Sequence, residues 1–79
     1  MSNELRRRAA FWRNMEFSLE QMCEEVKARS GDKWFDREDA NSTMALSTHL
    51  GGALCTVRKR YIEVLQSQIA DWNMGQGED

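Results

Sequence analysis

The stretch that decides the fold is LRRRAAFWRNMEFSLEQMCEEV, residues 5–26. Apolar side chains recur along it at spacings that place them on one face of an α-helix. The members of this row are Leu5, Trp12, Met15, Leu19, Met22 and Val26, with Ala9 and Cys23 beside them. A helix with one apolar stripe is stable only when a partner surface covers that stripe. The rest of the chain is therefore expected to supply the partner.

A second long helix is expected over residues 39–73, and it carries two apolar rows. The first row is Leu46, Leu50, Ala53, Leu54, Val57, Tyr61 and Val64. The second row is Ile62, Leu65, Ile69 and Trp72. One neighbouring helix cannot cover both rows, so the second row is predicted to be the dimer interface with another copy of the chain.

Two adjacent glycines, Gly51 and Gly52, interrupt the second helix. Each costs about 1 kcal/mol relative to alanine within a helix. Three outcomes stay open: the helix kinks there, it breaks into two helices, or another backbone packs very close.

The predicted fold class is all-α, an antiparallel hairpin of two long helices that dimerises into a helical bundle. The single domain of residues 1–79 comprises a helix at about 3–30, a turn at 31–38, a helix at about 39–73 and a frayed tail at 74–79. Gly31 is expected to end the first helix in a left-handed conformation. Asp36 is the preferred cap of the second helix, with Asp39 and Ser42 as alternatives.

Composition excludes several classes of function. The chain has 79 residues, a net charge of −2 and 30% charged residues, which fits a small soluble helical protein. No stretch approaches the roughly 20 apolar residues of a membrane span, and the first residues do not resemble a secretory signal. Cys23 and Cys55 are isolated and read as reduced packing residues, so the predicted location is the cytoplasm.

Neither catalysis nor metal binding is predicted. His49 is the only histidine, and Cys55 follows it by six residues, which places the two side chains about 120° apart on a continuous helix. No pair of cysteines or histidines has the spacing of a zinc site. We therefore expect a protein that is not an enzyme and that has no cofactor.

Charged and aromatic residues outside the apolar rows are the candidates for binding another protein. Arginine and aromatic side chains dominate interface energies. The predicted partner-binding residues are Arg6, Arg13, Phe17, Trp34 and Phe35. Phe17 has an alternative role, packing on the second helix. Trp34 and Phe35 have one too, folding back over the open end of the helix pair.

The basic run Arg58-Lys59-Arg60 supports a different class of function. Residues 50–60, LGGALCTVRKR, resemble the centre of a helix-turn-helix, in which a Leu-Gly turn leads into a recognition helix. The resemblance implies DNA contacts by Thr56, Arg58 and Lys59, with Arg60 adjacent. It departs from the pattern at Gly52, where that family usually has an apolar residue.

Two further resemblances concern small phage proteins. Residues 45–50, ALSTHL, followed by Ala53 and Leu54, look like the hairpin helix of phage proteins that sequester cyclic nucleotide signals. In size and style, the whole chain is similar to accessory proteins of phages and mobile elements, such as anti-CRISPR or host-takeover proteins. The main hypothesis is therefore a cytoplasmic inhibitor or regulator that binds a host protein. The DNA-binding regulator is the alternative, and the sequestering protein is the third hypothesis.

Overall fold

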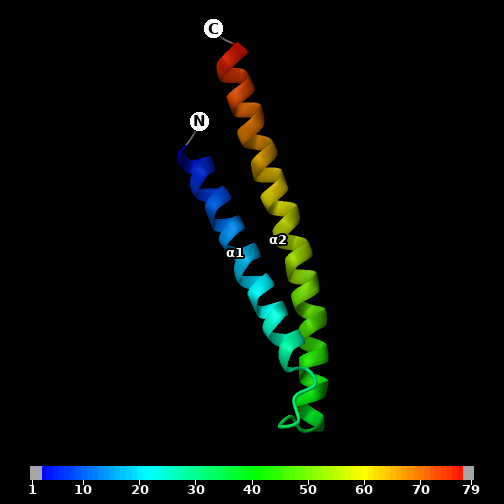
Figure 1. Cartoon of the computed structure of the whole chain (residues 1–79). Helices are drawn as coiled ribbons and strands as arrows, with labels where there is room; N and C mark the ends of the chain where they lie inside the picture. The colour runs from blue at the N-terminus through cyan, green and yellow to red at the C-terminus, as the bar shows by residue number, and fades with distance from the viewer. Residues whose placement is uncertain (1–2, 78–79) are drawn as a thin grey trace.

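The chain folds as two long helices packed against each other. The computed structural model describes residues 3–77, with α1 at Asn3–Arg29 and α2 at Arg37–Gly77. Within these residues there are no strands. Both ends of the chain lie toward the same end of the molecule, so the helices are antiparallel (Figure 1). The predicted all-α hairpin is confirmed.

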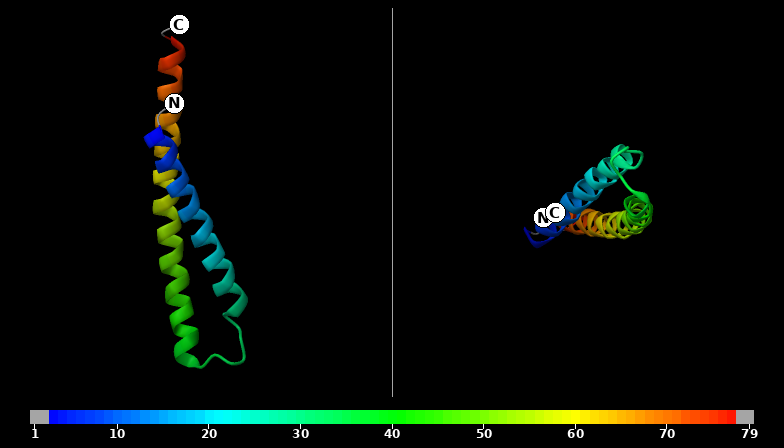
Figure 2. Two further views of the ribbon diagram at one scale, coloured as in Figure 1. Left: turned by 90° about the vertical axis from the view of Figure 1, so that its left-hand side faces the viewer. Right: turned by 90° about the horizontal axis from the view of Figure 1, so that it is seen from below.

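The hairpin is a thin rod in which the two helices lie side by side at an angle (Figure 2). It measures 64 × 15 × 14 Å. In two views at right angles, the helices overlap at opposite ends of the rod, which shows that they cross at an angle (Figure 2). α2 runs past the first turn of α1 and forms one end of the rod alone (Figure 1). Across residues 3–77, neither helix is long and apolar enough to cross a membrane.

Asp36 fixes the start of α2, two residues before the predicted start at residue 39. Its carboxylate oxygen Oδ1 accepts a hydrogen bond from the backbone N–H of Asp39, at 2.7 Å. Oδ2 of Asp39 in turn accepts one from the backbone N–H of Asp36, at 3.3 Å. This reciprocal pair satisfies backbone donors that the first helical turn leaves free. The preferred cap was therefore right, and the turn is shorter than predicted.

The expected left-handed glycine at Gly31 is wrong. No glycine among the described residues has a positive φ. Instead, the backbone N–H of Asp32 donates to the carbonyl of Arg29, at 2.9 Å. The Ser30 hydroxyl donates to the carbonyl of Lys27, at 3.2 Å. These two bonds satisfy the last carbonyls of α1 and make a left-handed residue unnecessary.

α2 is continuous through Gly51 and Gly52, so it does not break there. A Cβ atom built on either glycine would have no neighbouring atom within 4 Å, so no other backbone packs close. The flanking Leu50 and Leu54 are buried, and burying each leucine stabilises by about 1.5–3 kcal/mol, which offsets the cost of the glycines. α2 also extends to Gly77 and so includes residues 74–77, which were predicted to be part of a frayed tail. The last two residues of that predicted tail, 78–79, lie outside the described part of the chain.

The apolar core is thin and belongs to α2. Its four buried residues are Leu50, Leu54, Val57 and Val64, and α1 contributes no buried residue. α1 instead presents a half-buried row of Leu5, Ala9, Trp12, Glu16, Leu19, Cys23 and Val26.

The predicted row of α1 needs a correction. Met15 and Met22 were assigned to it, but they are 36% and 47% exposed. Alternating steps of four and three from Leu5 pass through Ala9, Glu16 and Cys23 instead. The position of a residue around the helix, rather than the hydrophobicity of its side chain, therefore decides whether it faces α2. Leu46 of α2 is likewise 40% exposed and lies outside the core row.

Candidate interaction surfaces

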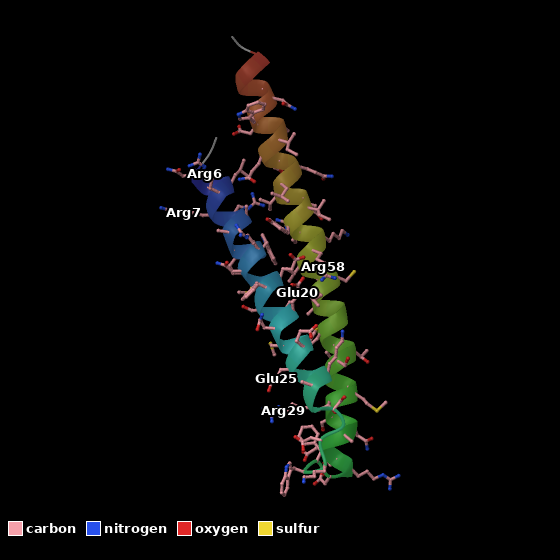
Figure 3. All side chains as sticks on the ribbon, in the orientation of Figure 1. Arg6, Arg7, Glu20, Glu25, Arg29 and Arg58 are labelled. Carbon is pink, nitrogen blue, oxygen red and sulfur yellow. The ribbon has the colours of Figure 1, made fainter. Side chains whose placement is uncertain are left out.

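One ion-pair cluster fixes how the two helices are aligned. Arg58 of α2 donates from Nε to Oε2 of Glu16, at 3.1 Å, and from Nη2 to Oε1 of Glu20, at 3.0 Å. Figure 3 shows Glu20 and Arg58 pointing toward each other between the helices. The hydrogen bonds to Glu20 and Glu16 raise the pKa of Arg58 above its usual value. The pairing places Glu20 and Arg58 on the same side of the hairpin.

Steps of seven residues from this pair follow the same side along the rod. Seven residues before Glu20 lies Arg13, and seven after Arg58 lies Leu65; the next step reaches Arg6 and Trp72. Figure 3 shows Arg6 in the first turns of α1. We call this surface the Trp side, and its members are Arg6, Arg13, Phe17, Ile62, Leu65, Ile69 and Trp72. Three of the residues predicted to bind a partner protein, Arg6, Arg13 and Phe17, thus lie beside the row predicted for a second copy.

The aromatic and aliphatic members of the Trp side are largely uncovered. Phe17 is 63% exposed, so its alternative role of packing on α2 is wrong. Ile62, Ile69 and Trp72 are 54%, 60% and 51% exposed, and Leu65 is half-buried. Exposed apolar side chains gathered on one side of a protein are typical of an interaction surface.

A groove of about 510 Å³ continues the Trp side toward the loop. Cys23 and Leu54 form its apolar lining, and Gly51 leaves space on the α2 wall. The polar lining residues are Glu20, Gln21, Glu24, Lys27, Ser47 and Arg58. The groove therefore combines an apolar floor with a charged rim.

A second exposed apolar surface was missed by sequence reasoning. Met15 and Met22 each come one residue before a member of the half-buried row, whereas Glu20 comes one residue after one. Residues before and after the contact row lie on opposite flanks of a helix pair. We call this flank the Met side, and its members are Phe11, Met15, Met22 and Leu46, which are 36–51% exposed. The position of the methionines relative to Leu5, Trp12 and Leu19 was the signal that could have found it.

The connecting loop carries an exposed aromatic residue. Trp34 is 80% exposed, so the expectation that it folds back over the helix pair is wrong for this residue. Phe35 is half-buried. The Trp34 backbone N–H donates to Oδ1 of Asp32, at 3.0 Å, and Lys33 Nζ lies 5.2 Å from the centre of the Trp34 ring. Trp34 and Phe35 follow the end of α1, whereas Arg6 lies near its start, so the predicted partner-binding set is not brought together.

The basic run of α2 is largely engaged within the hairpin. Arg58 is held by two glutamates, and Arg60 Nη1 lies 2.8 Å from Oε2 of Glu63. Thr56 and Lys59 are exposed. Because α2 is continuous from Arg37 to Gly77, the turn on which the helix-turn-helix resemblance depends is absent.

The resemblance to cyclic-nucleotide-sequestering proteins falls partly on the exposed residues 45–49 and partly on residues that hold the hairpin together. Leu50 and Leu54 are buried, and Cys55 is exposed rather than packed. In residues 3–77, no three His, Cys, Asp or Glu side chains are grouped so that they could hold a metal ion. Comparison of the chain with protein-family models, curated proteins and solved structures finds no match. The function is therefore argued from the chain's own surfaces.

Proposed function

We propose that this protein is a non-enzymatic, dimeric protein-binding module, an inhibitor or regulator of the kind that phages and mobile elements carry. The observation that carries the proposal is the ratio of exposed to buried apolar side chains. Among the described residues, four hydrophobic ones are buried, whereas eleven large ones are substantially exposed. A monomer with so small a core needs further burial to be stable, and binding to other protein surfaces supplies it.

The two apolar sides divide the work between two partners. The Trp side takes a second copy of the chain, because it includes the predicted dimer row of Ile62, Leu65, Ile69 and Trp72. The Met side then stays exposed on the dimer and takes the target protein. Methionine side chains are flexible and polarisable, so they adapt to irregular partner surfaces. Trp34 adds an exposed aromatic anchor at the loop.

The charge beside the Met side favours an acidic target. Arg7 and Arg8 lie in the first turns of α1 and outside the Trp side. Neither makes an ion pair within residues 3–77, and cations are disfavoured near a helix N-terminus, so folding does not account for them. Arg8 lies seven residues before Met15 and so continues the Met side. A target surface with carboxylates around an apolar patch fits this arrangement.

The experiment is an affinity capture from the native host with a matched pair of variants. Met15→Glu with Met22→Glu places two charges on the Met side. Asn14→Glu with Ala28→Glu places the same two charges on exposed positions of the same helix. All chains are first checked for helicity by circular dichroism. The proposal predicts a protein that is retained by the wild type and the control and lost by the Met-side variant.

Two results would contradict the proposal. Equal retention by both variants would exclude the Met side as the contact. Retention of nucleic acid instead of protein, lost at high salt, would favour the basic run of α2, since phosphate contacts weaken steeply with salt.

A further inference from the structure

One row of α2 carries the Trp-side residues of this helix, and its small and bulky side chains lie toward opposite ends. This arrangement suits pairing with the same row of a second copy that runs in the opposite direction. From Gly51, alternating steps of four and three give Gly51, Cys55, Arg58, Ile62, Leu65, Ile69 and Trp72. The two ends of the row differ in size: Gly51 and Cys55 are small, whereas Ile69 and Trp72 are bulky. Ile62 is the middle member. Reversing the row about Ile62 therefore places Trp72 opposite Gly51 and Ile69 opposite Cys55.

We propose that two copies of the chain pair antiparallel through this row, with Trp72 of each copy seated in the groove at Gly51 of the other. The proposal rests on the dimer proposed above and adds its direction and register. Ile62 of one copy meets Ile62 of the other at the two-fold axis, and Ile69 lies opposite Cys55. Such an interface is isologous, so each contact occurs twice.

The groove has the properties that a docked tryptophan needs. It lies at Gly51, where a Cβ atom built on the backbone meets nothing within 4 Å, and its floor of Cys23 and Leu54 is apolar. A buried indole N–H requires an acceptor. The rim offers the carboxylates of Glu20 and Glu24. Trp72 is 51% exposed in the single hairpin, so half of its surface is available for burial.

Charges on α1 are complementary in the same register. Because Arg13 lies beside Leu65 and Glu20 beside Arg58, placing Leu65 opposite Arg58 of the other copy also places Arg13 opposite its Glu20. Phe17 falls near the two-fold axis, next to Ile62. Arg58 sits inside this interface, but Glu16 and Glu20 already balance its charge. A parallel pairing through this row would instead set Trp72 against Trp72.

The exposed surface of a single hairpin is large enough to form an interface with a second copy. The chain exposes 6379 Å², whereas a compact monomer of 9.2 kDa exposes about 4,900 Å². The excess of about 1,500 Å² exceeds the roughly 800 Å² that each partner buries in a standard interface. A face that runs from Gly51 to Trp72 is about 32 Å long and offers room for such an interface.

Disulfide trapping tests the register directly. In a Cys23→Ser background, Ile69→Cys places a thiol opposite the native Cys55 of the other copy. Within one chain, these two positions lie about 21 Å apart along the helix, too far for a disulfide, which needs Cα atoms within about 7 Å. A covalent dimer joined between residues 55 and 69 is expected after mild oxidation. Gln66→Cys in the same background, on the outer face of α2, is the control that should stay uncoupled.

Every other outcome would contradict the proposed register, and only one of them would also contradict the proposed dimer. A bond between the two copies of residue 69 would mean parallel pairing. A dimer by light scattering that forms no bond between residues 55 and 69 would mean a different face or register. In both cases the proposed dimer survives. A monomer at all concentrations would remove the dimer itself.

A second test uses the adjacent glycines as a matched pair. Gly51→Leu fills the space that receives Trp72, whereas Gly52→Leu points outward on the same turn. Both changes remove a glycine from the helix, and neither Cβ meets an atom within 4 Å. Gly51→Leu is expected to raise the Kd of dimerisation about tenfold or more, with Gly52→Leu close to wild type. Equal effects of the two changes would overturn the seating of Trp72 at Gly51.

Discussion

The Trp side and the Met side of the hairpin are both exposed and apolar, but they are built from different residues. The α2 part of the Trp side is rich in isoleucine and tryptophan, which have few rotamers and pack in one defined way. The Met side uses methionines, which adjust to whatever surface they meet. Rigid side chains suit a partner whose shape never changes, such as a second copy of the chain. Flexible side chains suit a target that is a different protein and evolves separately.

The same contrast separates the outside of the rod from its inside. The core of four buried residues holds the hairpin together, and the Trp side is expected to hold two hairpins together. The following changes test these surfaces, and they run from the largest expected effect to the smallest.

Ile62→Asp should have the largest effect on assembly. It places two aspartates together at the proposed two-fold axis, and an uncompensated charge buried in an interface costs about 3–5 kcal/mol. Sedimentation velocity is expected to show a monomer at concentrations where the wild type is a dimer. Gln66→Asp adds the same charge on the outer face of α2 and should remain dimeric. If the Ile62 variant is also dimeric, the Trp side is not the interface.

Leu54→Ala should have the largest effect on the hairpin core. Leu54 is 8% exposed, and removing a buried leucine side chain lowers the free energy of unfolding by about 2–5 kcal/mol. Met22→Ala, on the 47% exposed Met side, should cost less than about 1 kcal/mol. Urea denaturation followed by circular dichroism measures both. Similar losses at the two positions would show that Met22 is part of the core after all.

Gly52→Ala should have the smallest effect, and it should be a gain. Gly52 is exposed within a continuous helix, and a Cβ there meets no other atom. Replacing such a glycine restricts the unfolded chain and stabilises by about 0.4–1 kcal/mol. The midpoint of thermal unfolding should rise, with no change in oligomeric state. A lower midpoint would mean that the outer face of α2 is covered in solution.

Much of the fold was predictable because it depends on local patterns. Leu5, Trp12, Leu19 and Val26 recur every seven residues, and this repeat alone sets the contact face of α1. The cap of α2 was identifiable because aspartate suits that position whatever the tertiary structure. These features depend only on residues that are close together in the sequence.

The surfaces were harder to predict, since they depend on how the two helices are aligned. Met15 and Met22 looked like core residues by hydrophobicity, and only the phase of the half-buried row shows that they flank it. Arg58 looked like a free cation for nucleic acid. Its partners Glu16 and Glu20 lie about forty residues earlier in the sequence, and no local pattern connects them.

For the same reason, the sequence could not predict that Arg13, Phe17 and Leu65 lie on one side of the hairpin. Interaction residues were expected on each helix, but the sequence does not say which stripe of α1 lies beside which stripe of α2. The Arg58 ion pairs show that alignment, and it supports the proposal that Phe17 belongs to the dimer interface rather than to the partner surface.

The central claim is that the Trp side is covered by a second copy, and the mass of the wild-type protein in solution tests it most directly. Sedimentation equilibrium over a wide range of concentrations should give about 18 kDa, twice the 9.2 kDa of one chain, with dissociation only on dilution. A mass of 9.2 kDa at every concentration would contradict the account, because the Trp side would then be exposed in the free protein.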